Sequence, residues 1–349
     1  MGRAALTDTV AAEGFAMPAE FGAHRGTLMA WPTREALWGR HFERAKDDYA
    51  AVARAVASFE PVIMVCRPGS AAEVRNRCGA GVEPLELPID DSWIRDNGPI
   101  FVSNERGEVA MVHFRFNSWG EKYLPYDRDA RLPVLLAEAL GVRRYEAPMV
   151  LEGGSFFVDG EGTLLTTEQC LLNPNRNPDR SREEIEDLLC AFLGVEKVVW
   201  LPFGMAEDRD TDGHVDGVAQ VVRPGTVLLL RPRDPSDPDA ARGEANAGRL
   251  AAERDARGRT FEVIDVPVTA TVEVEGYGPV AIPYLNLYLV TGGVIVPTGG
   301  VPQDEEALSL VRNAFPDREV VPVPGAILSF GGGGPHCITQ QIPDGRFVA

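Results

Sequence analysis

The sequence lacks the short motifs by which several large enzyme classes are recognised. It has no H-E-x-x-H or H-x-H pattern, no C-x-x-C pair, no G-x-S-x-G elbow and no phosphate-binding P-loop. These absences argue against the standard zinc, serine-hydrolase and P-loop nucleotide chemistries. The five cysteines are an odd number without paired spacing, which fits a reducing compartment better than a disulfide framework.

The chain is also short of positive charge and of long hydrophobic runs. Lys and Arg total 34 against 52 Asp and Glu, so the formal net charge at pH 7 is −18. Such a charge argues against nucleic acid and anionic membranes as partners and favours a cationic ligand, although it also serves solubility. No window approaches the apolar length of a membrane span, and the N-terminus has no signal-peptide core. We therefore expect a cytoplasmic protein.

Helix and strand patterns alternate regularly along most of the chain. Residues 1–16 are predicted to be a flexible tail, and residues 17–349 a single catalytic domain. Hydrophobic periodicity predicts main helices over 41–59, 130–140, 181–193, 240–256 and 304–314. Each is followed by an apolar run typical of a strand, at 62–66, 142–145, 198–201, 261–266 and 320–323.

A polar motif, often containing glycine, follows each of these strands. The motifs are DDSWIRDNGP, LEGGS, DTDGHVDG, YLNLY and GGGGPHC. The chain therefore contains five strand–helix–strand units without clear sequence identity. Repeated units that cannot bury their own apolar faces often close around a common axis, which would bring the motifs together. A doubly wound parallel sheet is the alternative α/β arrangement that the same alternation allows.

Cys337 stands directly after four consecutive glycines and His336, in the segment GGGGPHCITQQIP. A backbone without side chains lets a ligand approach closely, so this cysteine is a candidate nucleophile. The alternative is a small core residue, since free cysteine is among the most buried residue types. The motif alone does not separate the two.

Two further motifs offer an imidazole and carboxylates. His214 and Asp216 open the apolar run VAQVV; in a strand, residues two apart face the same side, so both side chains would enter one cavity. Such a pair suits general acid/base chemistry, with a solvated acidic loop as the alternative. Glu152 lies between Leu151 and a Gly-Gly step, where a buried carboxylate must be paired or functional.

The motif DDSWIRDNGP places Trp93 and Asp96 beside the extended stretch PIFV. Asp96 could bind a ligand or could pair with Arg95 or a backbone N–H group. The neighbouring Asp90 and Asp91 are predicted to cap a turn or to lie in solvent.

One chemistry uses a cysteine, a histidine and several carboxylates without a metal. Carboxylates bind the planar guanidinium group, a thiol attacks its electrophilic carbon, and a histidine protonates the leaving amine and then activates water. The residue set therefore points to guanidine hydrolysis without a cofactor. A zinc hydrolase that uses nitrogen, oxygen and sulfur ligands from HVD and HC is the other hypothesis.

These motifs resemble, in order and over nearly the whole chain, the agmatine deiminase family of guanidine-modifying enzymes. The resemblance rests on MPAEF, WP, DDSWIRDNGP, FNSWGEKY, LEGGSFFVDGEGTLLTTEQCLLNPNRNP, GHVDG and GGGGPHCITQQIP. It implies a five-bladed α/β propeller around a central active site, in agreement with the five units. It also implies a small cationic guanidine substrate and, because relatives often self-associate, a homo-oligomer.

The resemblance implies roles for the candidate residues. It makes Cys337 the nucleophile and His214 the general acid/base, with Glu152 assisting binding or proton transfer. Asp96 and Asp216 match the carboxylates that hold the guanidinium, and Trp93 is expected to pack along the substrate stem. It implies no metal and no cofactor.

The sequence departs from the family pattern at four places, which bear on the tail-binding end of the site and not on the guanidine chemistry. They are Gly217, the region after Trp31-Pro32, the segment 282–288 and Pro335. The resulting prediction is agmatine deiminase, which produces N-carbamoylputrescine and ammonia. Deimination of arginine or peptidylarginine, transfer of the amidino group to an amine, and polyamine binding without catalysis are the alternatives.

Overall fold

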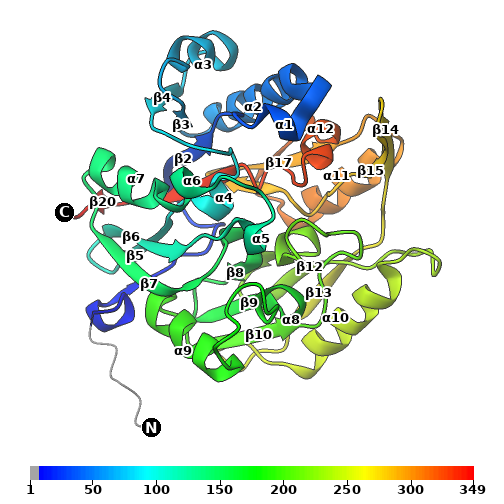
Figure 1. Cartoon of the computed structure of the whole chain (residues 1–349). Helices are drawn as coiled ribbons and strands as arrows, with labels where there is room; N and C mark the ends of the chain where they lie inside the picture. The colour runs from blue at the N-terminus through cyan, green and yellow to red at the C-terminus, as the bar shows by residue number, and fades with distance from the viewer. Residues whose placement is uncertain (1–7) are drawn as a thin grey trace.

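The computed structural model describes residues 8–349 and has a mixed α/β architecture, with its main helices at the periphery and its strands between them (Figure 1). The main helices are α2 (Phe42–Ala57), α7 (Leu132–Leu140), α9 (Arg182–Leu193), α10 (Ala240–Ala252) and α11 (Gln303–Ala314). All the main helices predicted from the sequence are therefore confirmed. The largest difference is at the end of α10, which stops at Ala252 because Arg254 pairs with Thr260 in a β-bridge.

Within the described residues, one strand arrangement recurs in five sheets. Two antiparallel strands are followed by a main helix and by a third strand that pairs parallel with the second. Four of the sheets take all three strands from consecutive chain: β5 (Ile100–Asn104), β6 (Glu108–Arg115) and β7 (Arg144–Val150); β8 (Phe156–Val158), β9 (Thr163–Thr167) and β10 (Lys197–Leu201); β11 (Ala219–Arg223), β12 (Thr226–Leu230) and β13 (Glu262–Val266); β16 (Tyr288–Val290), β17 (Gly293–Thr298) and β18 (Glu319–Pro324).

The fifth sheet joins the two ends of the chain. Its antiparallel pair combines β19 (Thr339–Pro343) with β2 (His24–Ala30), and β3 (Val62–Cys66) and β4 (Val82–Glu86) complete it. Since antiparallel pairs occur and the strands are divided among separate sheets, the doubly wound parallel sheet is wrong. The short strands β1 (Phe15–Ala16) and β20 (Arg346–Phe347) add to the β5–β6 sheet, and β14 (Thr271–Val274) and β15 (Gly278–Ala281) form a separate hairpin.

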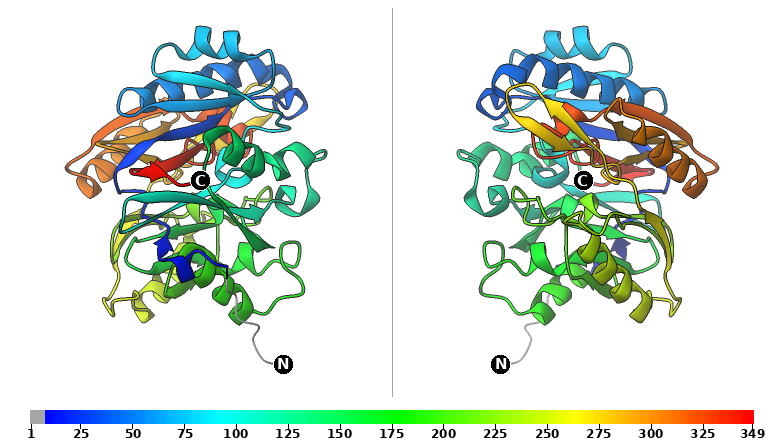
Figure 2. Two further views of the ribbon diagram at one scale, coloured as in Figure 1. Left: turned by 90° about the vertical axis from the view of Figure 1, so that its left-hand side faces the viewer. Right: turned by 90° about the vertical axis from the view of Figure 1, so that its right-hand side faces the viewer.

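The predicted flexible tail is wrong for residues 8–16; residues 1–7 lie outside the described part. Val10 is buried, Phe15 pairs with β5 and the Glu13 carboxylate accepts a hydrogen bond of 2.6 Å from Arg143. The turn η1 (Ala11–Glu13) packs beside α9, as the turned views show (Figure 2). The apolar side chains in this short segment drive it onto the core, a signal that its low periodicity concealed.

The helix ends follow their local sequence. Ser181 and Glu184 form the predicted capping box at the start of α9, and Gly194 ends that helix with a φ of 68°. Shorter helices occupy the connections: α1 (Glu35–Trp38), α3 (Ala71–Cys78), α4 (Ile94–Asn97), α5 (Ser118–Glu121), α6 (Asp127–Ala130), α8 (Glu168–Leu171) and α12 (Ala326–Phe330). From residue 8 onward, every helix is too short or too polar to cross a membrane.

Candidate active site

The polar motifs meet around the backbone of Gly154. A β-carbon built on this glycine would lie 2.6 Å from His214 Nδ1, 2.9 Å from Asp216 Oδ2 and 3.0 Å from Asp96 Oδ1. The Cys337 sulfur lies 3.5 Å from the same Asp216 oxygen. The structure therefore brings together candidate residues that are up to 241 positions apart in the chain (337 − 96 = 241).

Cys337 lies in the turn just before β19 and is buried in the wall of a cavity. Asn286 donates a hydrogen bond of 3.2 Å to its sulfur. Burial raises the pKa of the thiol well above its usual range, and the charges of Asp216 and Asp96 raise it further. Gly333 is required beside it, because a β-carbon there would lie 2.9 Å from the sulfur and 2.8 Å from the Trp93 ring.

This raised pKa predicts how Cys337 reacts in the free protein. The rate of its alkylation by iodoacetamide should keep rising with pH beyond the ordinary thiol pKa of about 8.5, because only the thiolate is nucleophilic. A saturating guanidinium ligand should protect it. Peptide mass spectrometry at Cys337 measures the rate, and a plateau reached below pH 8.5 would contradict the expectation.

The His214 imidazole lies between two carboxylates. Its Nδ1 is 3.9 Å from Asp96 Oδ2, and its Nε2 is 3.9 Å from Glu152 Oε2. Although burial lowers the pKa of His214, the Asp96 carboxylate and its other neighbours outweigh burial and hold the pKa well above its usual value. The imidazole is therefore protonated at neutral pH and can act as an acid.

The local geometry of His214 and Asp216 differs from the predicted strand. His214 immediately precedes a short 3₁₀ helix, η4 (Val215–Gly217), and Asp216 lies within it. The strand β11 begins only at Ala219. The glycines on either side, Gly213 and Gly217, favour this turn over an extended strand. Both side chains still enter one site, but the tight turn and not strand alternation places them there.

Asp216 belongs to a buried chain of charges that the sequence did not reveal. His336 Nδ1 lies 2.8 Å from Asp216 Oδ2, and His336 Nε2 lies 2.9 Å from Glu20 Oε2. Arg95 completes the chain, 3.2 Å from the same Glu20 oxygen. Burial raises the pKa of Asp216, but its bond to His336 and the charges of His336, His214 and Arg95 together outweigh burial, and the net shift is downward. Asp216 is therefore held as a carboxylate.

Glu152 is fully buried and held by a partner that the sequence did not identify. Arg176 donates a hydrogen bond of 2.6 Å to Glu152 Oε1 and another of 2.7 Å to Asp212. Burial raises the pKa of Glu152, but the Arg176 charge and the His214 imidazole together outweigh burial, so the net shift is downward. The only available signal was that Arg176 lies within one of the recognised motifs.

Asp96, in α4, accepts hydrogen bonds of 2.9 Å from the Trp119 indole and from the backbone N–H of Gly154. Burial raises its pKa, and Asp216 and Glu152 add to this shift. Trp119 reaches Asp96 from a turn in which its own φ is +55°, an uncommon conformation for a bulky residue. The predicted bond between Asp96 and a backbone N–H is thus present, although Asp96 also faces the cavity.

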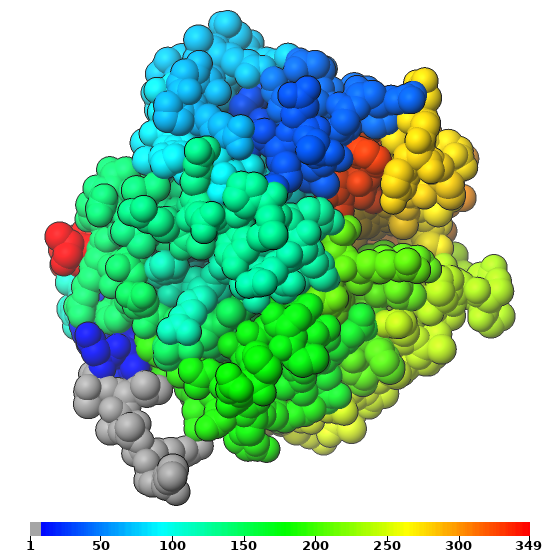
Figure 3. All heavy atoms as spheres, in the orientation of Figure 1, coloured from blue at the N-terminus to red at the C-terminus, as the bar shows by residue number. Residues whose placement is uncertain are grey.

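The site opens into a cavity with an empty volume of about 360 Å³, whose walls are Leu37, Asp91, Trp93, Asp96, Trp119, Tyr123, Asp210, Thr211, Gly331, Gly332 and Cys337. A larger hollow of about 1680 Å³ shares Cys337, Asp210 and Gly332 with it and reaches the surface beside the β14–β15 hairpin (Figure 3).

Trp93 stacks on Trp38, with ring centroids 5.8 Å apart. The expectation of solvent exposure is wrong for Asp91, which is buried and bound to Arg34 at 2.7 Å.

Because His214 and two aspartates lie so close to the Gly154 backbone, a methyl group added at this position should disturb the site. Gly154→Ala should lower turnover roughly tenfold to a hundredfold, because the methyl group displaces His214 and the two aspartates. The backbone of Gly154 has no left-handed φ, so the fold should be retained. Gly248→Ala in α10, where no atom lies within 4 Å of the new methyl group, is the matched control and should keep wild-type kinetics. Equal turnover in the two variants would contradict the convergence at Gly154.

Comparison with known proteins gives consistent matches. The model of the Porphyromonas-type peptidyl-arginine deiminase family matches residues 16–343. An agmatine deiminase of Pseudomonas aeruginosa is 43% identical over an alignment of 363 positions, which covers 97% of this chain and 98% of the relative. One from Pseudomonas fluorescens is 44% identical over 361 residues, with the same coverage. The solved structure of an agmatine deiminase of Enterococcus faecalis superposes with a TM-score of 0.93 at 35% identity, covering 98% of this chain and 100% of the other.

Proposed function

We propose that this chain, which belongs to the Porphyromonas-type peptidyl-arginine deiminase family, is an agmatine deiminase. It hydrolyses the guanidine group of agmatine to N-carbamoylputrescine and ammonia, a hydrolysis at a C–N bond of a linear amidine. The resemblance drawn from the motifs is confirmed by the family match and by relatives that cover nearly the whole chain. The observation that carries the proposal is the convergence of His214, Asp96 and Asp216 around Gly154, with the Cys337 sulfur 3.5 Å from Asp216 and in the wall of the adjoining cavity.

In the first step, the substrate guanidinium lies between Asp96 and Asp216 with its carbon against the Cys337 sulfur. The bound cation lowers the raised pKa of the thiol, because it offsets the two carboxylates that disfavour the thiolate. The thiol proton passes to water, and the thiolate forms a C–S bond with the guanidine carbon as a C–N π pair moves to nitrogen. The protonated His214 then donates its proton to the departing nitrogen, the C–N bond breaks and ammonia leaves.

In the second step, the amidino-thioether that remains on Cys337 is hydrolysed. His214 is now neutral and takes a proton from water, whose oxygen attacks the same carbon. The C–S bond breaks, the remaining hydroxyl proton of the adduct passes to the departing sulfur to restore the Cys337 thiol, and the ureido product leaves. Glu152 stabilises the imidazolium at both stages, because its free oxygen lies 3.9 Å from Nε2 while Arg176 holds the other.

Asp96 is predicted to contribute directly to substrate binding. Asp96→Asn should weaken the binding of agmatine by about 1.5–3 kcal/mol, because a charge-assisted hydrogen bond is lost. The amide NH₂ group would also face the Trp119 and Gly154 donors, which are matched to a carboxylate. Substrate binding to an inactive Cys337 variant, measured by calorimetry, tests this, with the exposed Asp127→Asn as the control. Unchanged affinity would remove Asp96 from the guanidinium site.

The substrate is tested by comparing kcat/KM for agmatine, free arginine and an arginyl peptide. Cys337 is only 6% exposed, at the wall of a cavity of about 360 Å³, which supports a small substrate over a protein. A preference for the peptide would identify a peptidylarginine deiminase. Transfer of the amidino group to an added amine, without stoichiometric ammonia, would identify an amidinotransferase.

The arrangement of the recurring sheets supports a finer description of the fold. The five sheets are blades of an α/β propeller, closed where β19 pairs with β2, and residues 17–349 form one catalytic domain. Trp93 packs along the aliphatic stem of the substrate from the cavity wall. The enzyme works in the cytoplasm and associates with further copies of itself; sedimentation of the purified chain tests the latter.

A further inference from the structure

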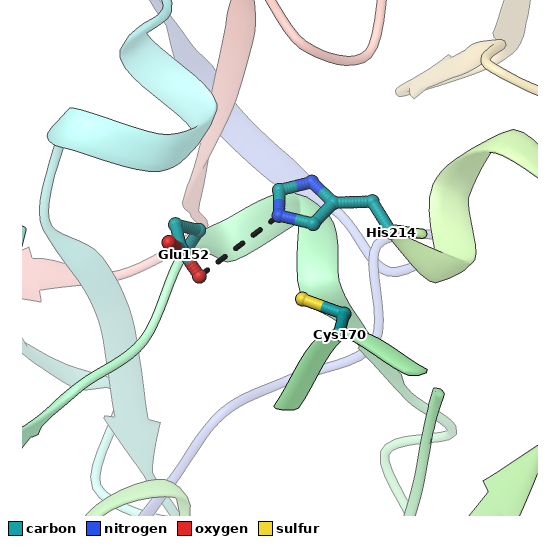
Figure 4. A group of neighbouring side chains, drawn as sticks. All are labelled: Glu152, Cys170 and His214. Atoms are coloured by element: carbon teal, nitrogen blue, oxygen red, sulfur yellow. Dashed lines mark ion pairs between the residues drawn. The ribbon is translucent and has the colours of Figure 1, made fainter. Parts of the chain in front are cut away.

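A second buried cysteine, Cys170, lies beside His214. Glu152, Cys170 and His214 each direct one donor atom toward a common point, and the three atoms lie within 4.8 Å of one another (Figure 4). Cys170 is in α8, which follows β9, whereas Glu152 precedes η3 and His214 precedes η4. The mechanism proposed above gives Cys170 no task.

The imidazole and carboxylate donors of this cluster are not hydrogen-bonded to other groups of the described residues. Within residues 8–349, both His214 nitrogens and Glu152 Oε2 are buried without a hydrogen-bond partner. Arg176 binds only the other oxygen of Glu152 and shares its charge with Asp212. Buried polar atoms are rarely left unpaired in proteins, so a ligand that binds the imidazole and the carboxylate together is favoured here, and the Cys170 sulfur lies within 4.8 Å of both donor atoms.

We propose that Glu152, Cys170 and His214 form a binding site for a thiophilic divalent cation, with Zn²⁺ as the best fit. Zinc takes sulfur, nitrogen and oxygen ligands at about 2.0–2.3 Å, which places tetrahedral ligand atoms roughly 3.5 Å apart. The distance from His214 Nε2 to Glu152 Oε2 is already 3.9 Å. Binding displaces the Cys170 thiol proton and one imidazolium proton, so that a thiolate and a carboxylate balance the two charges of the ion. Water completes the tetrahedron.

Zinc at this site inhibits the enzyme. A His214 nitrogen bound to the metal cannot exchange protons with the leaving amine or with water, and the ion competes for Glu152. This consequence rests on the proposed function, whereas the binding of the metal does not. The site is distinct from the nucleophile, since Cys337 is not among the three ligands.

The experiment measures zinc binding and turnover separately on the full chain. Zinc affinity is measured by competition with a chromophoric chelator for wild type, Cys170→Ser, Cys337→Ser and the control Cys190→Ser, whose half-buried thiol lies on α9. We expect one zinc per chain in all but Cys170→Ser, in which affinity falls at least about tenfold because serine is a poor zinc ligand. Zinc should stop turnover in wild type and Cys190→Ser, EDTA should restore it, and Cys170→Ser should resist.

Equal zinc affinity in Cys170→Ser and wild type, or loss of zinc in Cys337→Ser, would overturn the site. If Cys170→Ser fails to fold, Co²⁺ added to the Cys337→Ser protein should give a thiolate-to-cobalt charge-transfer band, and its absence would also overturn it. Zinc binding in a chain that does not turn over agmatine would leave the site intact and reject the proposed function. Turnover without zinc binding would reject the site alone.

Discussion

Replacing Cys337 with alanine should abolish the release of ammonia from agmatine and leave the protein folded. The Cys337 thiol lies in the wall that the two cavities share. Its sulfur is 3.5 Å from an oxygen of Asp216, which is proposed to hold the guanidinium. Alanine occupies less volume than cysteine and creates no polar group that needs a partner, so the site should close with little change. Ammonia release is measured with a coupled assay, and folding by circular dichroism and Tm.

The control for loss of a buried thiol is Cys66→Ala, in β3. Its side chain is also buried, and burial raises its pKa to about 11, so it is not reactive at neutral pH. This variant should keep wild-type turnover while losing a comparable amount of stability. Mass spectrometry of quenched reactions should detect the amidino-thioether on wild type and not on Cys337→Ala. A Cys337→Ala protein that still released appreciable ammonia would end the thiol mechanism.

Much of the fold could be predicted from the sequence because its information is local. The main helices have the 3.6-residue periodicity, and α9 has its capping box and terminal glycine within a single stretch. The closure of the first sheet by β19 could not be predicted in this way, since Thr339 pairs with Met29, 310 positions away (339 − 29 = 310). The packing of residues 8–16 is likewise not a local property, because their burial depends on surfaces that β5 and α9 create.

The same difference between local and long-range information applies to the candidate site. Residue type and neighbouring glycines were enough to single out Cys337, His214 and Glu152. The partners that set their charges were not found, because an ion pair such as Arg176 with Glu152 leaves no pattern in the sequence. His336 illustrates the limit: it adjoins Cys337 in the chain, yet its task is to hold Asp216 and Glu20.

His214→Ala should lower kcat about 10²–10⁴-fold, the usual contribution of a general acid or base. The imidazole lies 3.9 Å from two carboxylates and, when removed, leaves them without the positive charge that separates them. Repulsion between Asp96 and Glu152 should then also raise KM modestly. His113→Ala is the control, because this half-buried histidine bonds to the Ala130 carbonyl outside the site and should keep wild-type kcat.

The pH profile distinguishes an acid/base role of His214 from a purely structural one. Because the pKa of His214 is raised, the imidazolium needed for ammonia departure persists through neutral pH and is lost only as pH rises through that raised value. Wild-type kcat should therefore fall on the alkaline side. The variant should lose this alkaline fall, and added imidazole should restore part of its turnover. A variant that keeps the wild-type profile at a reduced rate would show that His214 only orders the carboxylates, and the proton would then have to come from another group.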